Sequence, residues 1–159
     1  MGTEGSKIVD LDLNDLIEKL NKALADEWLA YYQYWIGSKV VKGPASEAAI
    51  AELIEHADEE KKHADMLIDR ILQLDGTPII NFEDLHKKST CGYLPPSDYD
   101  VKKILNQNIE GERCAIKVYN DLVKLTKDKD PITHSIVLEI LKDEIEHEDD
   151  LEKLLEDIS

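Results

Sequence analysis

Two Glu-x-x-His segments are the strongest candidates for metal ligands in this chain. The first is Glu60 with His63, and the second is Glu144 with His147. Residues three apart share one face of a helix, so each pair points in one direction. Apolar residues flank both glutamates at helical offsets of three, four and seven, with Glu148 as the one polar exception. Both pairs therefore face a core, where a carboxylate is unfavourable unless something neutralises it.

A lone glutamate in the same apolar register precedes each pair. Glu27 lies 33 residues before Glu60, and Glu112 lies 32 residues before Glu144. A glutamate from each of two helices, with Glu-x-x-His from two others, is the ligand set of two-metal carboxylate bundles. Carboxylates can bridge two cations, and four of them balance two divalent charges. We therefore predict that the catalytic and metal-binding residues are Glu27, Glu60, His63, Glu112, Glu144 and His147.

Two other glutamates compete for this role. Glu110 is the rival of Glu112, but its neighbours at helical offsets form a polar stripe, which favours Glu112. A third Glu-x-x-His, Glu83 with His86, lies in a segment without the apolar register. We interpret it as a chance match.

The remaining histidines and several aromatic residues are given structural roles. His56 and His134 fall outside the paired pattern, so we expect surface or helix-end positions for them. We expect Tyr31, Tyr34 and Trp35 to pack in the core. A relay of electrons beside the metal site is the alternative for these three.

Clusters of glycine and proline divide the chain into four long segments with helical periodicity. The first runs from near Asp12 to Lys42-Gly43-Pro44, and the second follows at once and ends at Asp75-Gly76-Thr77-Pro78. A connection this short makes them an antiparallel pair. The third is expected to open at Ser97, and the fourth at Asp130-Pro131, where a capping residue precedes a first-turn proline.

A long connection separates the second helix from the third. Residues 76–97 contain three prolines and two glycines, and Asn81 to His86 could form a short helix within them. About twenty extended residues reach roughly 65 Å, more than the roughly 45 Å of a thirty-residue helix. The segment can therefore run back along the whole bundle. We predict one all-α domain over residues 1–159, with two antiparallel helix pairs joined by a crossover.

Composition limits the partners that this chain can have. It has 159 residues, 42% of them hydrophobic, and a net charge of -16. Such a charge disfavours nucleic acid and anionic membrane surfaces, and the tail from Met1 to Asp10 has a single lysine. With neither a signal peptide nor a membrane-length apolar run in the sequence, we expect a cytoplasmic protein. The two cysteines form no CxxC, and two free thiols are their default state in a reducing compartment.

The six candidate ligands resemble the bacterioferritin-type di-iron site of the ferritin-like superfamily, and the four-helix pattern covers nearly the whole chain. Bacterioferritins carry a haem-ligating methionine directly after the glutamate of the first pair. This chain has Lys61 at that position, so no haem is expected.

The long crossover resembles that of Dps-type mini-ferritins, which form twelve-subunit shells. Those proteins take a metal-binding histidine from the first helix, and this first helix contains none. With Cys91 before the third helix and Cys114 within it, the chain is similar to the Dps-like proteins called thioferritins, in which two cysteines lie beside the metal site. That resemblance implies a redox pair or a disulfide for Cys91 and Cys114, with two inert thiols as the alternative.

The resemblance implies a function as well as a fold. It predicts a homo-oligomeric, dodecameric shell that binds two iron ions per subunit, oxidises Fe(II) and stores ferric mineral, protecting the cell from oxidative stress. Hydrogen peroxide is the preferred oxidant, dioxygen is the other, and manganese could replace iron. The alternative is a di-metal enzyme without storage, either a rubrerythrin-like peroxidase, disfavoured by the missing CxxC, or a manganese catalase. A purely structural bundle would require solvent-facing glutamates.

Overall fold

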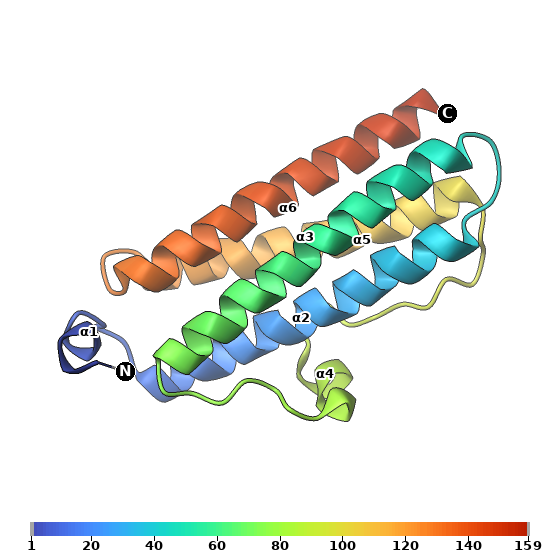
Figure 1. Ribbon diagram of the computed structural model, residues 1–159. Coiled ribbons are helices and arrows are strands. Elements are labelled where there is room, and N and C mark those ends of the chain that lie inside the picture. The colour runs from blue at the N-terminus through green and yellow to red at the C-terminus, as the bar shows by residue number, and fades with distance from the viewer. Residues whose placement is uncertain (1, 159) are drawn as a thin grey trace.

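The computed structural model describes residues 2–158, which form six helices and no strand. The helices are α1 (Thr3–Lys7), α2 (Leu13–Val40), α3 (Ser46–Gln73), α4 (Phe82–Lys88), α5 (Val101–Thr126) and α6 (Pro131–Asp157). The four long ones, α2, α3, α5 and α6, lie side by side as a bundle (Figure 1). Across residues 2–158, no helix is both long and apolar enough to cross a membrane.

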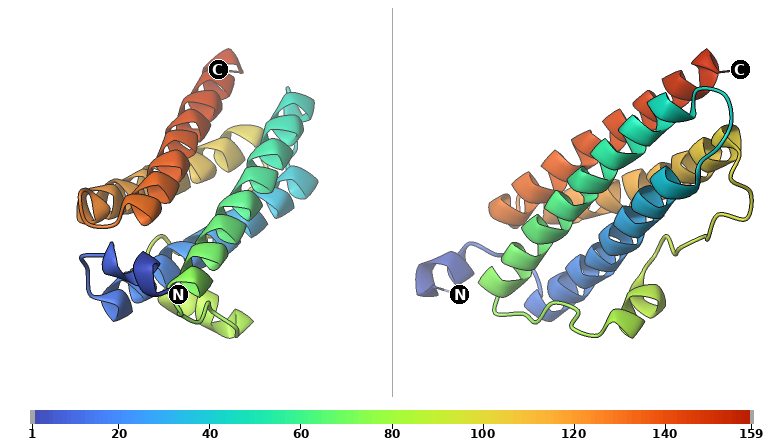
Figure 2. Two further views of the ribbon diagram at one scale, coloured as in Figure 1. Left: turned by 60° about the vertical axis from the view of Figure 1, so that its left-hand side comes forward. Right: turned by 45° about the vertical axis from the view of Figure 1, so that its right-hand side comes forward.

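The chain passes along the bundle as two antiparallel pairs joined by one long connection. α2 packs against α3 and α5 packs against α6. Between α3 and α5 the chain returns from one end of the bundle to the other, as both views in Figure 2 show. The short helix α4 interrupts this crossover and packs against α2, close to where the sequence predicted a helix from Asn81. The predicted topology is therefore confirmed.

Two helix starts follow the capping residues that the sequence indicated. The side chain of Asp12 accepts a hydrogen bond from Asp15 N at 2.8 Å and caps α2. Asp130 caps α6 by accepting bonds from the backbone N–H groups of Ile132 and Thr133. Each cap satisfies backbone donors that have no partner within their own helix.

The predicted start of the third long helix is wrong. α5 begins at Val101 with Asp100 as its cap, and not at Ser97. The reason is a bridge between backbones: Lys42 N donates to Tyr99 O at 2.8 Å, and Val101 N donates to Lys42 O at 2.9 Å. These bonds hold the chain extended directly before Val101, so the helix cannot begin earlier.

The apolar core is divided into two clusters. One contains Leu16, Leu20 and Leu24 of α2 and extends toward the α5–α6 loop. The other contains Tyr34 and Leu53 and lies toward the opposite end. On each long helix, the predicted metal ligands fall between the residues of these two clusters. The core thus encloses a polar layer at mid-bundle.

A buried ion pair ties α3 to the start of α6. Arg70 Nη2 donates to Asp130 Oδ1 at 3.0 Å and to Oδ2 at 2.9 Å, and Arg70 Nε donates to Thr133 Oγ1 at 2.8 Å. Arg70 is 5% exposed and Asp130 is fully buried. Burial would raise the pKa of Asp130, but hydrogen bonds from Thr133 and Arg70 outweigh it and hold this pKa below its usual range.

Replacing Arg70 by methionine should destabilise the fold strongly at neutral pH. Asp130 would keep its buried charge without a cation to pair with it, which costs about 3–5 kcal/mol of unfolding free energy. The pKa of Asp130 is lowered in the folded state, so the pair stabilises above the unfolded pKa and its contribution is lost as pH falls through the folded value. The loss of unfolding free energy caused by Arg70→Met should therefore be smaller at pH 3 than at pH 7. Urea unfolding of the metal-free protein measures this loss.

The matched control is Lys62→Met, which removes an exposed pair with Glu139. Its expected cost is below about 1 kcal/mol. A loss for Arg70→Met as small as this, or one unchanged at pH 3, would contradict the role given to the buried pair.

Candidate metal centre

All six side chains predicted as ligands meet in the polar layer at mid-bundle. α2 contributes one glutamate, α5 contributes one glutamate, and α3 and α6 each contribute a Glu-x-x-His pair. Each of the six is at most 2% exposed. They are Glu27, Glu60, His63, Glu112, Glu144 and His147.

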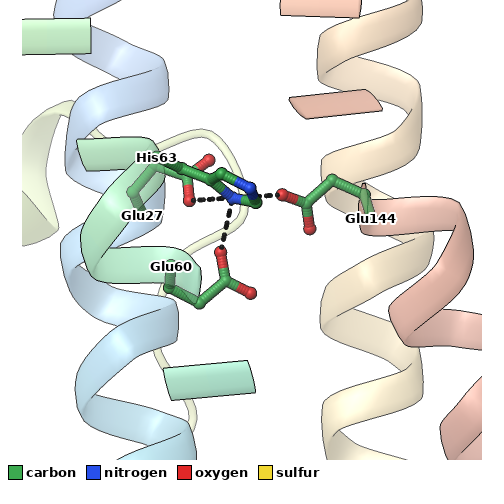
Figure 3. Close-up of side chains that lie close together, drawn as sticks. All are labelled: Glu27, Glu60, His63 and Glu144. Carbon is green, nitrogen blue, oxygen red and sulfur yellow. Dashed lines mark ion pairs between the residues drawn. The ribbon is translucent and has the colours of Figure 1, made fainter. Parts of the chain in front are cut away.

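The first half of the centre is arranged around His63 (Figure 3). The Nδ1 atom of His63 lies 3.1 Å from Glu144 Oε1. The same atom lies 3.4 Å from both Glu27 Oε2 and Glu60 Oε2. One ligand atom from each of these four residues falls within 4.8 Å of all the others, the spacing of a set that can surround one cation.

The second half is arranged around His147 and uses two of the same glutamates. The Nδ1 atom of His147 lies 3.4 Å from Glu60 Oε1, 3.8 Å from Glu144 Oε2 and 3.9 Å from Glu112 Oε2. Glu60 and Glu144 therefore present one oxygen to each imidazole. Two carboxylates placed in this way could each supply one oxygen to either of two cations.

Two bound metal cations would satisfy ligand atoms that have no other partner. Among the described residues, each of the six contributes one buried ligand atom without a hydrogen bond. Buried polar atoms are nearly always satisfied in folded proteins, so such a cluster needs an explanation. The donors are imidazoles and carboxylates, a set that suits divalent iron, manganese or zinc once the imidazoles lose their protons. The residues thus fit a two-metal site. The unpartnered atoms are Glu27 Oε2, Glu60 Oε1, His63 Nδ1, Glu112 Oε2, Glu144 Oε1 and His147 Nδ1.

Outer carboxylates fix both imidazoles. His63 Nε2 lies 3.1 Å from Asp143 Oδ2, and His147 Nε2 lies 2.6 Å from Glu59 Oε2. A carboxylate that holds the outer nitrogen orients the ring and leaves the inner nitrogen for a metal. Each acid directly precedes the glutamate of the other Glu-x-x-His pair. These partners were not predicted from the sequence, although an acid directly before each motif is a visible signal.

Two tyrosines hold the lone glutamates in the same reciprocal way. The hydroxyl of Tyr34 donates to Glu112 Oε1, and the hydroxyl of Tyr119 donates to Glu27 Oε1. Each tyrosine comes seven residues after the lone glutamate of its own helix and bonds the other one. These bonds leave the second oxygen of each glutamate facing inward. Each half of the centre therefore depends on a tyrosine from the helix that supplies the lone glutamate of the other half.

The expectation of core packing holds for two of three aromatic residues. Tyr34 is 1% exposed, and Tyr31 packs partly buried against the same cluster. Trp35 is 41% exposed, so the prediction that it packs in the core is wrong. Its ring lies beside the exposed Tyr32, with centroids 5.8 Å apart.

When no cation is bound, burial and neighbouring carboxylates favour protonated side chains in the centre. Burial raises the pKa of Glu60, and so does the nearby charge of Glu27. Burial would lower the pKa of His147, but the nearby carboxylates, first Glu60, raise it to about 9. Burial also opposes protonation of His63, yet Glu144 and the other carboxylates around it raise its pKa well above the usual range. Cations must therefore displace protons from these ligands.

The competing glutamates are exposed and do not belong to the clustered ligands. Glu110 is exposed on α5 and pairs with Arg113 at 2.5 Å. Glu83 and His86 are exposed on α4, within the crossover. The apolar register thus separated buried from exposed carboxylates correctly.

The two remaining histidines differ from each other. His134 Nδ1 lies 3.2 Å from Thr126 Oγ1 at the start of α6, which confirms a helix-end position. The expectation of a surface or helix-end role for His56 is wrong, because it is 2% exposed at mid-helix in α3. Its ring stacks on His147 with centroids 4.1 Å apart. Spacing along α3 could not reveal a neighbour that α6 supplies.

A disulfide lies beside the centre. Cys91 of the crossover is bonded to Cys114 of α5, with their Cα atoms 5.8 Å apart. A cavity of about 110 Å³ lies between this crossover segment and the buried ligands Glu60 and Glu144. Exposed Leu94 also lines it, so the cavity connects the centre with the surface.

Asp26 holds the crossover in place next to the disulfide. Its Oδ1 atom accepts hydrogen bonds from Thr90 N and Cys91 N, both at 2.8 Å. Burial raises the pKa of this carboxyl to about 6, although the two bonds oppose the shift. The sequence analysis did not single out Asp26, because its partners come from a distant loop.

Removing the disulfide should destabilise the subunit. The two cysteines are 23 positions apart, and a crosslink of that span stabilises by about 3 kcal/mol by restricting the unfolded chain. We expect Cys91→Ser with Cys114→Ser to lower the unfolding free energy by about that amount in guanidinium titrations. Reductant should lower the stability of the unaltered chain equally and leave the double variant unchanged. A difference below about 1 kcal/mol would contradict this.

The chain is similar in sequence to known proteins. The family described as "Ferritin-like domain" matches residues 17–159. A DNA protection during starvation protein from Pyrococcus furiosus is 38% identical over 148 residues, covering 91% of this chain and 79% of the relative. A bacterioferritin from Brucella melitensis is 30% identical over 142 residues, covering 89% and 83%.

Solved structures agree with these relatives. A dodecameric thioferritin, the bacterioferritin-related protein from Bacteroides fragilis, superposes with a TM-score of 0.96 at 43% identity, covering 99% of this chain and 95% of that one. Dps from Thermosynechococcus elongatus superposes with a TM-score of 0.84 at 20% identity, covering 90% and 92%, and supports the fold alone. The chain therefore belongs to the ferritin-like domain family, with Dps proteins and bacterioferritins among its relatives.

Proposed function

We propose that this protein is an iron-oxidising mini-ferritin whose subunit binds two Fe(II) ions as substrate. The supporting observation is the set of six inward, buried ligand atoms without hydrogen-bond partners. One ion lies between Glu27 and His63, the other between Glu112 and His147, and Glu60 and Glu144 bridge them. Manganese fits the same donors, so binding of iron is part of the proposal.

The electrons released by oxidising two Fe(II) ions match those that one oxidant molecule takes up. Two Fe(II) ions give one electron each to hydrogen peroxide, which takes up two protons and leaves as two water molecules. With dioxygen, the same two electrons and two protons yield hydrogen peroxide. The cavity beside Cys91 is the route for the oxidant, because its roughly 110 Å³ exceeds the roughly 30 Å³ share of a water molecule. Peroxide is the preferred oxidant in this proposal.

Storage requires an enclosed space that one subunit does not provide. We propose a dodecameric shell in the cytoplasm, because the 43% identical protein from Bacteroides fragilis is described as dodecameric. The net charge of -16 suits an acidic interior that attracts iron cations. Ferric ions leaving the centre would accumulate there as mineral, and their removal would limit damage by peroxide and iron.

The test combines particle size with iron loading. Light scattering on a sizing column should give a particle of about twelve subunits. Repeated additions of Fe(II) with peroxide should leave ferric iron in that particle, far above two ions per subunit. A monomer or dimer that turns over peroxide and retains no iron would favour a di-metal peroxidase or catalase instead.

A further inference from the structure

A second group of metal-binding side chains lies one helical turn from the centre. Glu52 and His56 are four residues apart on α3, so they share one face of that helix. Asp150 of α6 lies close to both. One ligand atom from each of these three residues lies within 4.8 Å of the other two. None of them belongs to the six ligands described above.

His56 is the buried member of this group. Its Nε2 atom points to Glu52, lying 3.2 Å from Oε1, while its Nδ1 atom is buried without a hydrogen-bond partner. Its ring lies between two residues of the centre: it stacks on His147 and meets the edge of Tyr34 at a centroid distance of 5.3 Å. Neither His147 nor Tyr34 forms a hydrogen bond with the imidazole of His56. A histidine that is 2% exposed, faces an acid with one nitrogen and leaves the other without a partner requires an explanation.

The ligand atoms of the two carboxylates, Glu52 and Asp150, lie within 4.8 Å of each other. Burial raises the pKa of Glu52, and the charges of Asp150, Glu55 and Glu59 raise it further against the opposing effect of His147. The basic group near Asp150 is Lys153, whose Nζ is 3.7 Å from Asp150 Oδ1 but hydrogen-bonds to Asp149. The pair thus gathers negative charge beside a histidine, which favours a cation.

We propose that Glu52, His56 and Asp150 bind a third divalent transition-metal ion. Two carboxylates and one imidazole suit Fe(II), Co(II), Mn(II) or Zn(II). The side chains of Glu52 and Asp150 are 29% and 38% exposed, so water can complete the coordination and the ion can exchange with solvent. The stacking of His56 on His147 places this exchangeable site directly beside the centre. Its use as a station that supplies iron rests on the proposed function, whereas binding of the third ion does not.

The test uses Co(II) as the probe and the full-length protein without oxidant. Equilibrium dialysis should give three Co(II) ions per subunit, and anomalous diffraction should place one between His56, Glu52 and Asp150. The double variant Glu52→Gln with Asp150→Asn should bind two. Each single substitution should weaken the third ion by more than about ten-fold, since changes to outer ligand partners alone cost 10–100-fold.

Asp58→Asn is the matched control, because Asp58 is an exposed acid on α3 and lies outside the ligand group. It should keep three ions. The inference is overturned if the unaltered protein shows no anomalous peak at His56 under Co(II) that fills the centre, or if the double variant still binds three. Failure of the proposed function looks different: the centre would stay empty or be inactive while the peak at His56 remained.

Discussion

Glu60→Gln should abolish rapid Fe(II) oxidation, because Glu60 presents one oxygen to each imidazole of the centre. Both ions would lose a bridging ligand at once. We expect the rate to fall by at least about 100-fold, since even changes to outer ligand partners cost 10–100-fold in affinity or activity. Stopped-flow absorbance after mixing two Fe(II) per subunit with peroxide measures this rate, and Glu144→Gln should behave in the same way.

The control for this experiment is Glu83→Gln in the exposed Glu-x-x-His of α4. It removes the same chemical group from the same motif outside the bundle core, and the oxidation rate should not change. Unchanged kinetics in Glu60→Gln, or equal losses in both variants, would show that the six residues are wrongly assigned.

Metal affinity should rise steeply with pH, because cations must displace protons from the ligands. The pKa of His147 is raised to about 9 and that of His63 well above its usual range, so both imidazoles are protonated at pH 7 in the metal-free protein. Loading the centre then releases at least two protons, and each released proton changes the overall binding constant about ten-fold per pH unit. We therefore expect the overall binding constant for loading the centre to rise roughly 100-fold between pH 6 and pH 7.

Titration calorimetry with Zn(II) in buffers of different ionisation enthalpy counts these protons directly. Proton release should fall by about one in His147→Ala, which lacks one titrating imidazole. An affinity that does not depend on pH between 6 and 8 would contradict the proton occupancy described here.

The sequence was sufficient for the fold because local patterns carry it. Apolar spacing placed the long helices, and glycine and proline clusters placed their ends. The start of α5 was missed because the hydrogen bonds of Lys42 to Tyr99 and Val101 join segments far apart in the chain. Trp35 was misplaced because an aromatic residue near a stripe can still lie at its edge.

The ligand positions could be predicted for a similar reason. A glutamate such as Glu112 that interrupts an apolar stripe is visible from spacing along one helix. Partners supplied by another helix are not, which is why Asp143, Glu59 and the burial of His56 were not anticipated. The register of one helix against its neighbour decides those contacts, and no single segment contains that information.

The most direct test of the two-metal account is anomalous diffraction at the iron edge from crystals loaded with Fe(II) without oxidant. We expect two iron peaks between Glu60 and Glu144, roughly 3.5–4 Å apart, one beside Nδ1 of His63 and one beside Nδ1 of His147. A single peak there, or iron bound only at the protein surface, would contradict it.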